Sequence, residues 1–389
     1  NQDGIADRPV QYLYEDQQGR VWCGGTGTLG YFNGTEYRDL VPLYEQQYGQ
    51  PPSPHWTNEC WGIAQDLSGN IWFGFDYLVR FDDESFFRYD VEDGFPQDAT
   101  CYVVGSDQAG TVWIGRAGDQ QGLWRYANGT FCRESVELGG MLRKIQSDRE
   151  GRVWFCTRHG ALWYDGAGFD RFTTDDGLPY PVVNAMHQDR EGQFWFGTWG
   201  GGVALYDADG LAVFGRGEDF PEGEAEISQI RQDRRGDIWI GFATPFLSLT
   251  SESICRFDGE TFEFIGARQG LDLNSCFAIY VDGNDDLWFG GGNGLFRYAG
   301  ETFERIGSDA GFGPVGVSAV AQDHAGRLVV AQWENGTTAK REELFASPLQ
   351  IVRLQGDQFE TLYREQEKGD PFNHIGALVA TRDRELWFS

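Results

Sequence analysis

The sequence predicts an all-β protein built from a repeated unit of four antiparallel strands. One pattern recurs nine times, and its fullest copies have an aspartate, a glycine three residues later and a tryptophan three residues after that. The anchoring positions of the nine copies are Trp22, Trp72, Trp113, Trp154, Trp195, Trp239, Trp288, Val329 and Trp387. Because a repeat of roughly 40 to 45 residues is typical of a propeller blade, we expect a β-propeller of four-stranded antiparallel blades, seven or eight in number.

The fourth repeat shows the expected strands most clearly. They cover 142–146, 152–156, 161–164 and 169–172, with the turn from Asp148 to Gly151 between the first two. Short runs of β-branched and aromatic residues, separated by Gly, Asp and Asn, are typical of hairpins. No apolar period of 3.6 residues persists along the chain, so the sequence does not predict long helices.

The repeats cover the whole chain, and we expect residues 1–389 to form one propeller array. Eight full repeats are expected at about 10–40, 59–90, 100–136, 141–174, 182–216, 226–266, 275–307 and 316–363, with a partial repeat at 375–389. These fit one eight-bladed ring with a stub, or a seven-bladed ring followed by the start of a second. Since the last residues stop inside an expected second strand, we expect the sequence to be a fragment of a longer chain.

The shared aspartate and tryptophan have structural explanations that need no ligand. The aspartate can accept a backbone N–H and the glycine can take a positive φ, which together close a tight hairpin. A tryptophan on the second strand can wedge between neighbouring blades, where its burial contributes roughly 1.5–3 kcal/mol or more. Eight of the 14 tryptophans are used in this way.

Composition excludes several classes of partner. The net charge of −29 and the absence of a basic run argue against nucleic acid and against an anionic membrane surface. The acidity is explained by solubility.

Cys60, Cys101 and Cys276 occupy a slot that other repeats fill with small apolar residues, and no Cys-x-x-Cys spacing exists. We therefore expect no zinc or redox site. No apolar run of 18 residues indicates a transmembrane helix.

At this point the unit resembles a known family. The run Asp-x-x-Gly-x-hydrophobic-Trp-aromatic-Gly, followed by Gly-Leu-x-Arg-Tyr, Phe and Asp-Gly-Leu-Pro, is similar to the two-component regulator propeller repeat; it is seen at 282–303 and 189–206. The resemblance implies the periplasmic sensor region of bacterial hybrid sensor kinases and related membrane signalling proteins. It also implies an association with sensing carbohydrate fragments, without naming a ligand. The eighth repeat departs from the pattern because Val329 replaces the tryptophan.

Function is expected where the repeats differ. Insertions interrupt the period at 43–58, 242–252, 332–348 and 364–371. By the order of strands in a blade, all four emerge on the face opposite the Asp-x-x-Gly turns, and we expect them around the mouth of a central channel. Long loops on one face of a rigid scaffold are a usual place for binding.

The residue four positions after the anchor varies from repeat to repeat, which packing alone does not require. Two tryptophans there offer stacking faces, and an aspartate and an arginine offer charge-assisted hydrogen bonds, which suits a sugar or another polar, flat-faced solute. With their neighbours, the expected ligand-binding residues are Trp56, Asp76, Arg116, Arg158, His159, Trp199, Trp333 and Glu334.

The sequence therefore favours an extracytoplasmic ligand-sensing propeller domain that binds a small or oligomeric solute on its insertion-rich face. Two alternatives stay open: a protein-interaction or dimerisation scaffold without a small ligand, and a propeller enzyme such as a glycoside hydrolase or lyase. No hydrolase, zinc-protease or phosphate-loop motif occurs, so we expect no catalytic residue in this segment. We also expect no cofactor and no metal, and a membrane only through flanking segments.

Overall fold

The computed structural model describes most of the chain and confirms the all-β prediction. The described residues are 12–25, 28–33, 37–49, 62–75, 77–96, 101–116, 122–139, 142–207, 209–215, 226–243, 252–300, 302–306, 315–322, 327–334, 349–355, 358–364, 378–380 and 386–388. They divide into two compact units, Asn1–Phe172 with Thr381–Ser389, and Thr173–Ala380. Within the described ranges no helix is long and apolar enough to cross a membrane.

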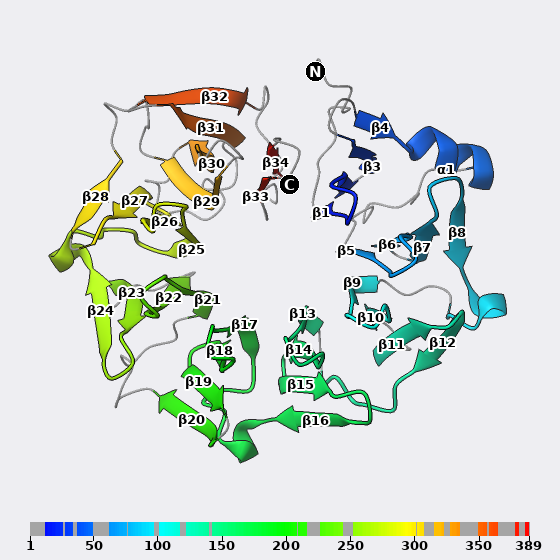
Figure 1. The fold of residues 1–389 in the computed structure, drawn as a ribbon, viewed down its shortest axis with the longest axis horizontal. Helices are drawn as coiled ribbons and strands as arrows, with labels where there is room; N and C mark the ends of the chain where they lie inside the picture. The colour runs from blue at the N-terminus through cyan, green and yellow to red at the C-terminus, as the bar shows by residue number, and fades with distance from the viewer. Residues whose placement is uncertain are drawn as a thin grey trace. The chain divides into compact units, whose positions relative to one another are not determined.

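Unit 1 contains four antiparallel sheets, each made of four strands that follow one another in the chain (Figure 1). We number these sheets as blades 1 to 4. Their strands are β1 (Tyr12–Glu15), β2 (Val21–Gly25), β3 (Thr28–Phe32) and β4 (Tyr37–Asp39); β5 (Gly62–Gln65), β6 (Ile71–Gly74), β7 (Leu78–Phe81) and β8 (Phe86–Tyr89); β9 (Cys101–Ser106), β10 (Val112–Arg116), β11 (Gly122–Ala127) and β12 (Thr130–Arg133); and β13 (Leu142–Ser147), β14 (Val153–Thr157), β15 (Gly160–Tyr164) and β16 (Phe169–Phe172).

Unit 2 repeats the plan in blades 5 to 8. Their strands are β17 (Val183–Gln188), β18 (Phe194–Thr198), β19 (Gly202–Asp207) and β20 (Gly210–Gly215); β21 (Glu226–Gln232), β22 (Ile238–Ala243), β23 (Glu252–Phe257) and β24 (Phe262–Gly266); β25 (Cys276–Val281), β26 (Leu287–Gly291), β27 (Gly294–Tyr298) and β28 (Phe303–Arg305); and β29 (Val315–Gln322), β30 (Leu328–Glu334), β31 (Leu349–Gln355) and β32 (Gln358–Arg364). Two further short strands are β33 (Leu378–Ala380), which belongs to unit 2, and β34 (Leu386–Phe388), which belongs to unit 1.

These eight sheets are the blades of a β-propeller, and their register follows the sequence pattern closely. In blade 4, Ser147 on β13 lies opposite Val153 on β14 beside the Asp148 turn, while Leu142 lies opposite Thr157 at the other end. Within each unit the first strands of successive blades are neighbours: β1, β5, β9 and β13 in unit 1, and β17, β21, β25 and β29 in unit 2. The seven-blade and eight-blade expectations are both consistent with the eight sheets described.

The repeated aspartate does more than close its turn. One carboxylate oxygen accepts backbone N–H groups of the turn, and the other accepts the indole N–H of the tryptophan six residues later, a bond that sequence reasoning did not foresee. Seven blades have this second bond, at 2.7 to 3.0 Å, in the pairs Asp16 with Trp22, Asp66 with Trp72, Asp107 with Trp113, Asp148 with Trp154, Asp189 with Trp195, Asp233 with Trp239 and Asp282 with Trp288. We call this pair of bonds the Asp clamp.

The anchoring tryptophans wedge between neighbouring blades, as predicted. Trp22 of blade 1 packs in one cluster with Ile71, Phe73 and Phe81 of blade 2. Trp239 of blade 6 does the same in a cluster of blade 7 residues, and both tryptophans are almost fully buried. The clamp therefore gives a buried indole N–H its acceptor, which an apolar inter-blade core alone could not do.

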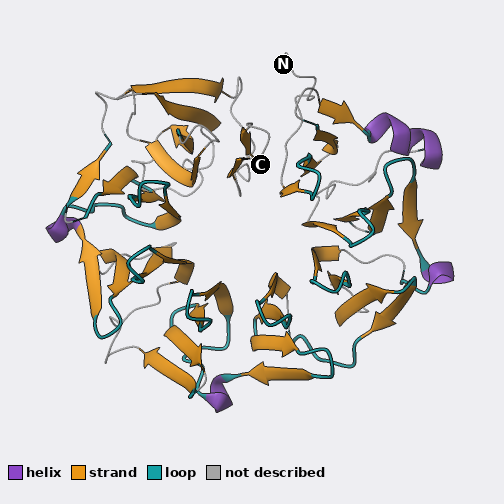
Figure 2. Cartoon of the chain, in the orientation of Figure 1, coloured by secondary structure: helices purple, strands orange, loops and turns teal. Residues whose placement is uncertain are grey.

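Helices are short, but one was missed by sequence reasoning. The first insertion forms helix α1 (Val41–Tyr48), which begins with Pro42 in its first turn and ends at Gly49 with a left-handed φ of 70°. The Tyr48 hydroxyl donates to the Phe86 carbonyl at 2.9 Å and accepts the Arg88 N–H at 3.0 Å, so α1 covers the edge of the outer strand β8 (Figure 2). This part of the insertion thus has a structural role, at an outer strand and not at a channel mouth. Three 3₁₀ turns, η1 (Val91–Asp93), η2 (Thr174–Asp176) and η3 (Ala267–Gln269), complete the helical segments described.

The prediction that Cys101 and Cys276 pack as small apolar side chains is confirmed. Cys101 and Cys276 are fully buried among apolar residues, and so is Cys156. Cys60 lies outside the described residues. Burial raises the pKa of the Cys156 thiol to about 11, so it packs as an apolar side chain. No group of three His, Cys, Asp or Glu side chains that could hold a metal occurs in the described part of the chain.

Candidate functional site

Three of the predicted site residues, Arg116, Arg158 and His159, lie at the edges of blades 3 and 4 that are opposite the Asp clamps. Arg116 is the last residue of β10, and Arg158 directly follows β14. The register places both at this edge, because Thr157 pairs with the first residue of β13 and Arg116 pairs with the first residue of β9. Blades 3 and 4 both belong to unit 1, so these positions can be described together.

Arg116 is held inside blade 3 rather than on its surface. Its residue is 3% exposed, and its guanidinium lies 5.2 Å from the centroid of the Phe95 ring. Burial lowers the pKa of Arg116, and the positive charge of Arg133 lowers it further, partly offset by Cys101. Arg116 stays protonated at neutral pH because arginine starts from so high a value.

Arg133 comes from the outer strand β12 and approaches the same edge. Arg116 pairs with Gly122 across β10 and β11, and a Cβ at Gly122 would lie 3.4 Å from Nε of Arg133. The glycine therefore leaves room for this guanidinium. Two arginines that repel each other are brought to one edge of blade 3.

Arg158 and His159 form the exposed turn between β14 and β15. The backbone N–H of His159 donates to Oγ1 of Thr157 at 3.0 Å, and that hydroxyl donates to the carbonyl of Gly160 at 2.9 Å. Thr157 is fully buried, so the turn stands on a fixed base. Among the described residues, no carboxylate pairs with Arg158.

A loop joins the two blades at this edge. Arg171 of β16 donates to the carbonyls of His159, at 3.3 Å, and of Glu137. Gly139 in the same loop has a φ of 64°, and a Cβ there would lie 2.6 Å from Cγ of His159. Burial lowers the pKa of Arg171, partly offset by Glu137. The loop residues 134–139 therefore pack directly against the turn that presents Arg158.

We call this set the arginine edge: Arg116, Arg133, Arg158, His159 and Arg171. Its charge is positive in a chain whose net charge is −29. Glu134, the acidic residue next to Arg133, forms an ion pair with Arg125. Gathered cations attract and orient an anion through charge-assisted hydrogen bonds, and a partly buried site strengthens them.

The other predicted residues belong to unit 2 or lie outside the described residues. Trp199 lies in unit 2, in the turn between β18 and β19, and is half-buried. Its backbone N–H donates to the carbonyl of Val182 at 3.0 Å. Trp333 and Glu334 end β30, and only their backbone is described. Trp56 and Asp76 lie outside the described residues.

Sequence reasoning missed Arg133 and Arg171. Both lie on outer strands, whose register with the turns at this edge is set by hairpin lengths that vary among repeats. A signal was nevertheless present, because arginines concentrate in blades 3 and 4 at the ends of strands, within an otherwise acidic chain.

The fold is a β-propeller, and one stretch of the chain matches a known family model. Residues 177–200, from the loop before β17 to the end of the β18 strand and its turn, match the family model described as two component regulator propeller. This confirms the resemblance found in the sequence. No curated protein sequence matches the chain.

Several solved structures resemble the fold at low identity. The extracellular domain of a one-component system from B. thetaiotaomicron is 15% identical, with a TM-score of 0.45 over 95% of this chain and 55% of that chain. The extracellular domain of a hybrid two-component system from the same organism is 14% identical, with a TM-score of 0.39 over 100% of this chain and 69% of that one. Virginiamycin B lyase from Staphylococcus aureus, with quinupristin, is 14% identical, with a TM-score of 0.45 over 70% and 91% of the two chains. The chain thus spans little more than half the length of the first of these, and none of them indicates what this chain binds.

Proposed function

We propose that this chain is the ligand-sensing propeller domain of a bacterial signal-transduction protein, on the extracytoplasmic side, and that its arginine edge binds an anionic small or oligomeric solute. A carboxylated saccharide is the solute class that we favour. The observation that carries the proposal is the gathering of Arg116, Arg133 and Arg158 at one edge of two adjacent blades. The family match at residues 177–200 supports the signalling context.

The chemistry of the edge explains the choice of solute. Arg158 is exposed and offers a planar fork that matches a carboxylate. Arg116, which is buried, and Arg133, which is exposed beside it, offer a second positive pair at the edge. A saccharide with a carboxylate would be held by the fork, and its hydroxyls would face the loop 134–139.

The test compares two sugars that differ only at C6. Galacturonate and galactose are titrated into the protein by calorimetry, alone and as short oligomers. We expect galacturonate binding that weakens with added salt, and much weaker binding of galactose. Arg158→Gln should weaken galacturonate binding about 10- to 100-fold, because one charge-assisted hydrogen bond contributes roughly 1.5–3 kcal/mol.

A matched control is Arg268→Gln, an exposed arginine in η3 of unit 2, which removes the same charge elsewhere. Equal binding of the two sugars, or equal loss in the two variants, would contradict the arginine edge as the site.

One observation favours a second candidate function, a protein-interaction scaffold. In unit 2, Tyr180 and Val213 are 36% and 37% exposed and line a hollow of about 330 Å³ with Pro179, Gly200 and Gly201. Apolar residues around a shallow hollow are typical of interaction surfaces. A change in association state on Tyr180→Ser, with galacturonate binding unchanged, would support this second function.

A further inference from the structure

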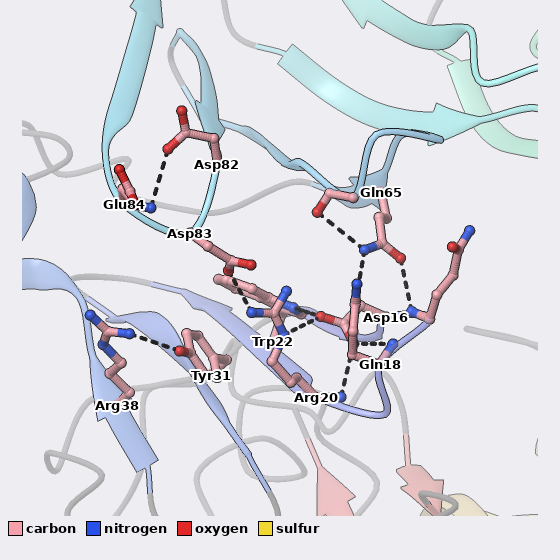
Figure 3. Close-up of polar contacts among 12 residues, drawn as sticks. Asp16, Gln18, Arg20, Trp22, Tyr31, Arg38, Gln65, Asp82, Asp83 and Glu84 are labelled. Carbon is pink, nitrogen blue, oxygen red and sulfur yellow. Dashed lines mark hydrogen bonds and ion pairs between the residues drawn. The ribbon is translucent and has the colours of Figure 1, made fainter.

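A glutamine links neighbouring blades at the opposite edge, beside the Asp clamps. It directly precedes the clamp aspartate, and its side-chain oxygen accepts the N–H of the residue that follows the clamp aspartate in the preceding blade. The pairs are Gln65 with Gln17 at 2.8 Å, Gln232 with Arg190 at 2.8 Å and Gln322 with Gly283 at 2.9 Å. Figure 3 shows the first of them, where the amide nitrogen of Gln65 also donates to Gln18 at 3.1 Å. We call this contact the glutamine link.

Blades 3 and 4 lack the link because serine replaces glutamine. Ser106 and Ser147 occupy the position directly before their clamp aspartates, and a serine hydroxyl cannot reach as far as a glutamine amide. The position before that is also small in blades 2 and 3, where Ala64 and Gly105 stand. In blades 1 and 4 to 7 the same position holds larger side chains, such as Tyr14.

The missing side-chain volume appears as a hollow within unit 1. It has a volume of about 450 Å³ and is lined by residues of β1, β5, β9 and β13 and of the clamp turn of blade 3. Polar atoms come from Ser106, Ser147, Gln108 and Gln146, and apolar surface comes from Ile63 and Ile145 among others. This volume is in the range of small-molecule sites.

The walls of the hollow are fixed by contacts that do not fill it. Gln108 donates from its side-chain nitrogen to the carbonyl of Asp148 at 2.9 Å and so joins blade 3 to blade 4. Both carboxylate oxygens of Asp107 accept bonds within its Asp clamp, from the backbone N–H of Thr111 and the indole N–H of Trp113. At Gly105, a Cβ would lie 3.1 Å from the side chain of Ile145, so the two inner strands are already in close contact.

The lining chemistry is that of neutral hydrogen bonding. No lysine, arginine or histidine lines the hollow, and its one carboxylate belongs to the clamp. Burial raises the pKa of the Tyr14 phenol, which therefore stays neutral. The Oγ atom of Ser147 is buried and has no hydrogen-bond partner among the described residues. A buried hydroxyl without a partner costs free energy, which a hydroxyl-bearing occupant would recover.

We propose that this hollow is a binding site for a small uncharged polyhydroxylated solute, such as a polyol or a monosaccharide. Hydroxyl groups of the solute bond to Ser106, Ser147 and Gln146, and its C–H face packs on Ile63 and Ile145. The site is separate from the arginine edge, because Ser147 and Leu142 lie at opposite ends of β13. Five residues of strand separate the two ends by about 16 Å.

The test restores the side chain that other blades carry. Ser106→Gln and Ser147→Gln together should fill the hollow and form two new glutamine links, so the thermal midpoint should stay the same or rise. Ser147→Ala removes the hydroxyl and leaves the volume. Ser68→Gln, at an exposed position of the blade 2 turn, is the control for the substitution itself.

Binding is measured by calorimetry and saturation-transfer NMR with glycerol, myo-inositol and glucose. We expect at least one of these probes to bind the native chain and the Ser68→Gln control. Binding should fall at least tenfold in the double glutamine variant, and less in Ser147→Ala. Absence of binding by all three probes, or equal binding in the double variant, would overturn the proposal. Galacturonate binding at the arginine edge should not change in these variants, so failure of one site is distinguishable from failure of the other.

Discussion

Replacing Asp233 with alanine should destabilise the propeller strongly, although its turn lies at the surface. One oxygen of Asp233 accepts the N–H groups of Arg235, Gly236 and Asp237 at 2.9, 3.1 and 3.0 Å, and the other accepts the indole N–H of Trp239 at 2.9 Å. In the variant, water can accept from the backbone N–H groups of Arg235 and Gly236, because these residues are not buried. It cannot reach the backbone N–H of Asp237 or the indole N–H of Trp239, because these residues are only 8% and 1% exposed.

The magnitude follows from these two buried donors. Each buried donor left without an acceptor costs about 1–3 kcal/mol, so Asp233→Ala should lower the free energy of unfolding by about 2–6 kcal/mol. Asp258→Ala is the control in the same blade, because Asp258 also accepts two backbone N–H groups of a turn, those of Glu260 and Thr261, but is exposed and has no indole partner. Asp258→Ala should lower the free energy of unfolding by clearly less, because water can accept from the same exposed backbone N–H groups.

The assay is urea unfolding of both variants, followed by circular dichroism. A double-mutant cycle with Trp239→Phe isolates the indole bond, and we expect a coupling of about 1–3 kcal/mol between Asp233 and Trp239. Equal effects of the Asp233 and Asp258 changes, together with a coupling near zero, would refute the reasoning that the clamp holds the blade interface.

The remaining predictions concern two links between elements and one buried thiol. Gln65→Ala should destabilise the chain by about 1–3 kcal/mol in urea unfolding, because the N–H of Gln17 loses its acceptor; no change would contradict the glutamine link. Tyr48→Phe removes two bonds between α1 and β8 and should speed amide exchange in β8 but not in β7. The Cys156 thiol should resist iodoacetamide at pH 8 while the exposed Cys132 reacts. Because the pKa of Cys156 is raised from 9.0 to about 11, the native state keeps a proton that the unfolded state loses between these pH values. The free energy of unfolding should therefore fall as pH rises from 9 to 11. A free energy of unfolding that does not change over this pH range would contradict the prediction.

Much of the fold could be predicted because the repeat is local. The strands on either side of the turn from Asp148 to Gly151 were predicted to within a residue or two of β13 and β14, since hairpin signals act over a few positions. The bond between Asp148 and Trp154 was not predicted, because it depends on the side-chain direction after the turn. Helix α1 was missed because eight residues are too few to show an apolar period, and its stability comes from packing on β8.

The site was predicted only in part, for a reason of geometry. Arg158 was found because it holds the variable position four residues after the anchor, and Arg116 because it is adjacent to the equivalent position in blade 3. Arg133 and Arg171 reach the same edge from outer strands, and only the register of the sheets brings them there. The hollow beside Ser106 and Ser147 is lined by residues of four blades, so no single repeat indicates it.

The central claim is that an anionic solute binds at the arginine edge of blades 3 and 4. Hydrogen exchange of the native chain, with and without saturating galacturonate oligomer, tests it most directly. The account predicts slower exchange in the loop 134–139 and in the turn from Arg158 to Gly160, with the clamp turns of the same blades unchanged. Slower exchange confined to other parts of the chain, or no change at saturation, would contradict it.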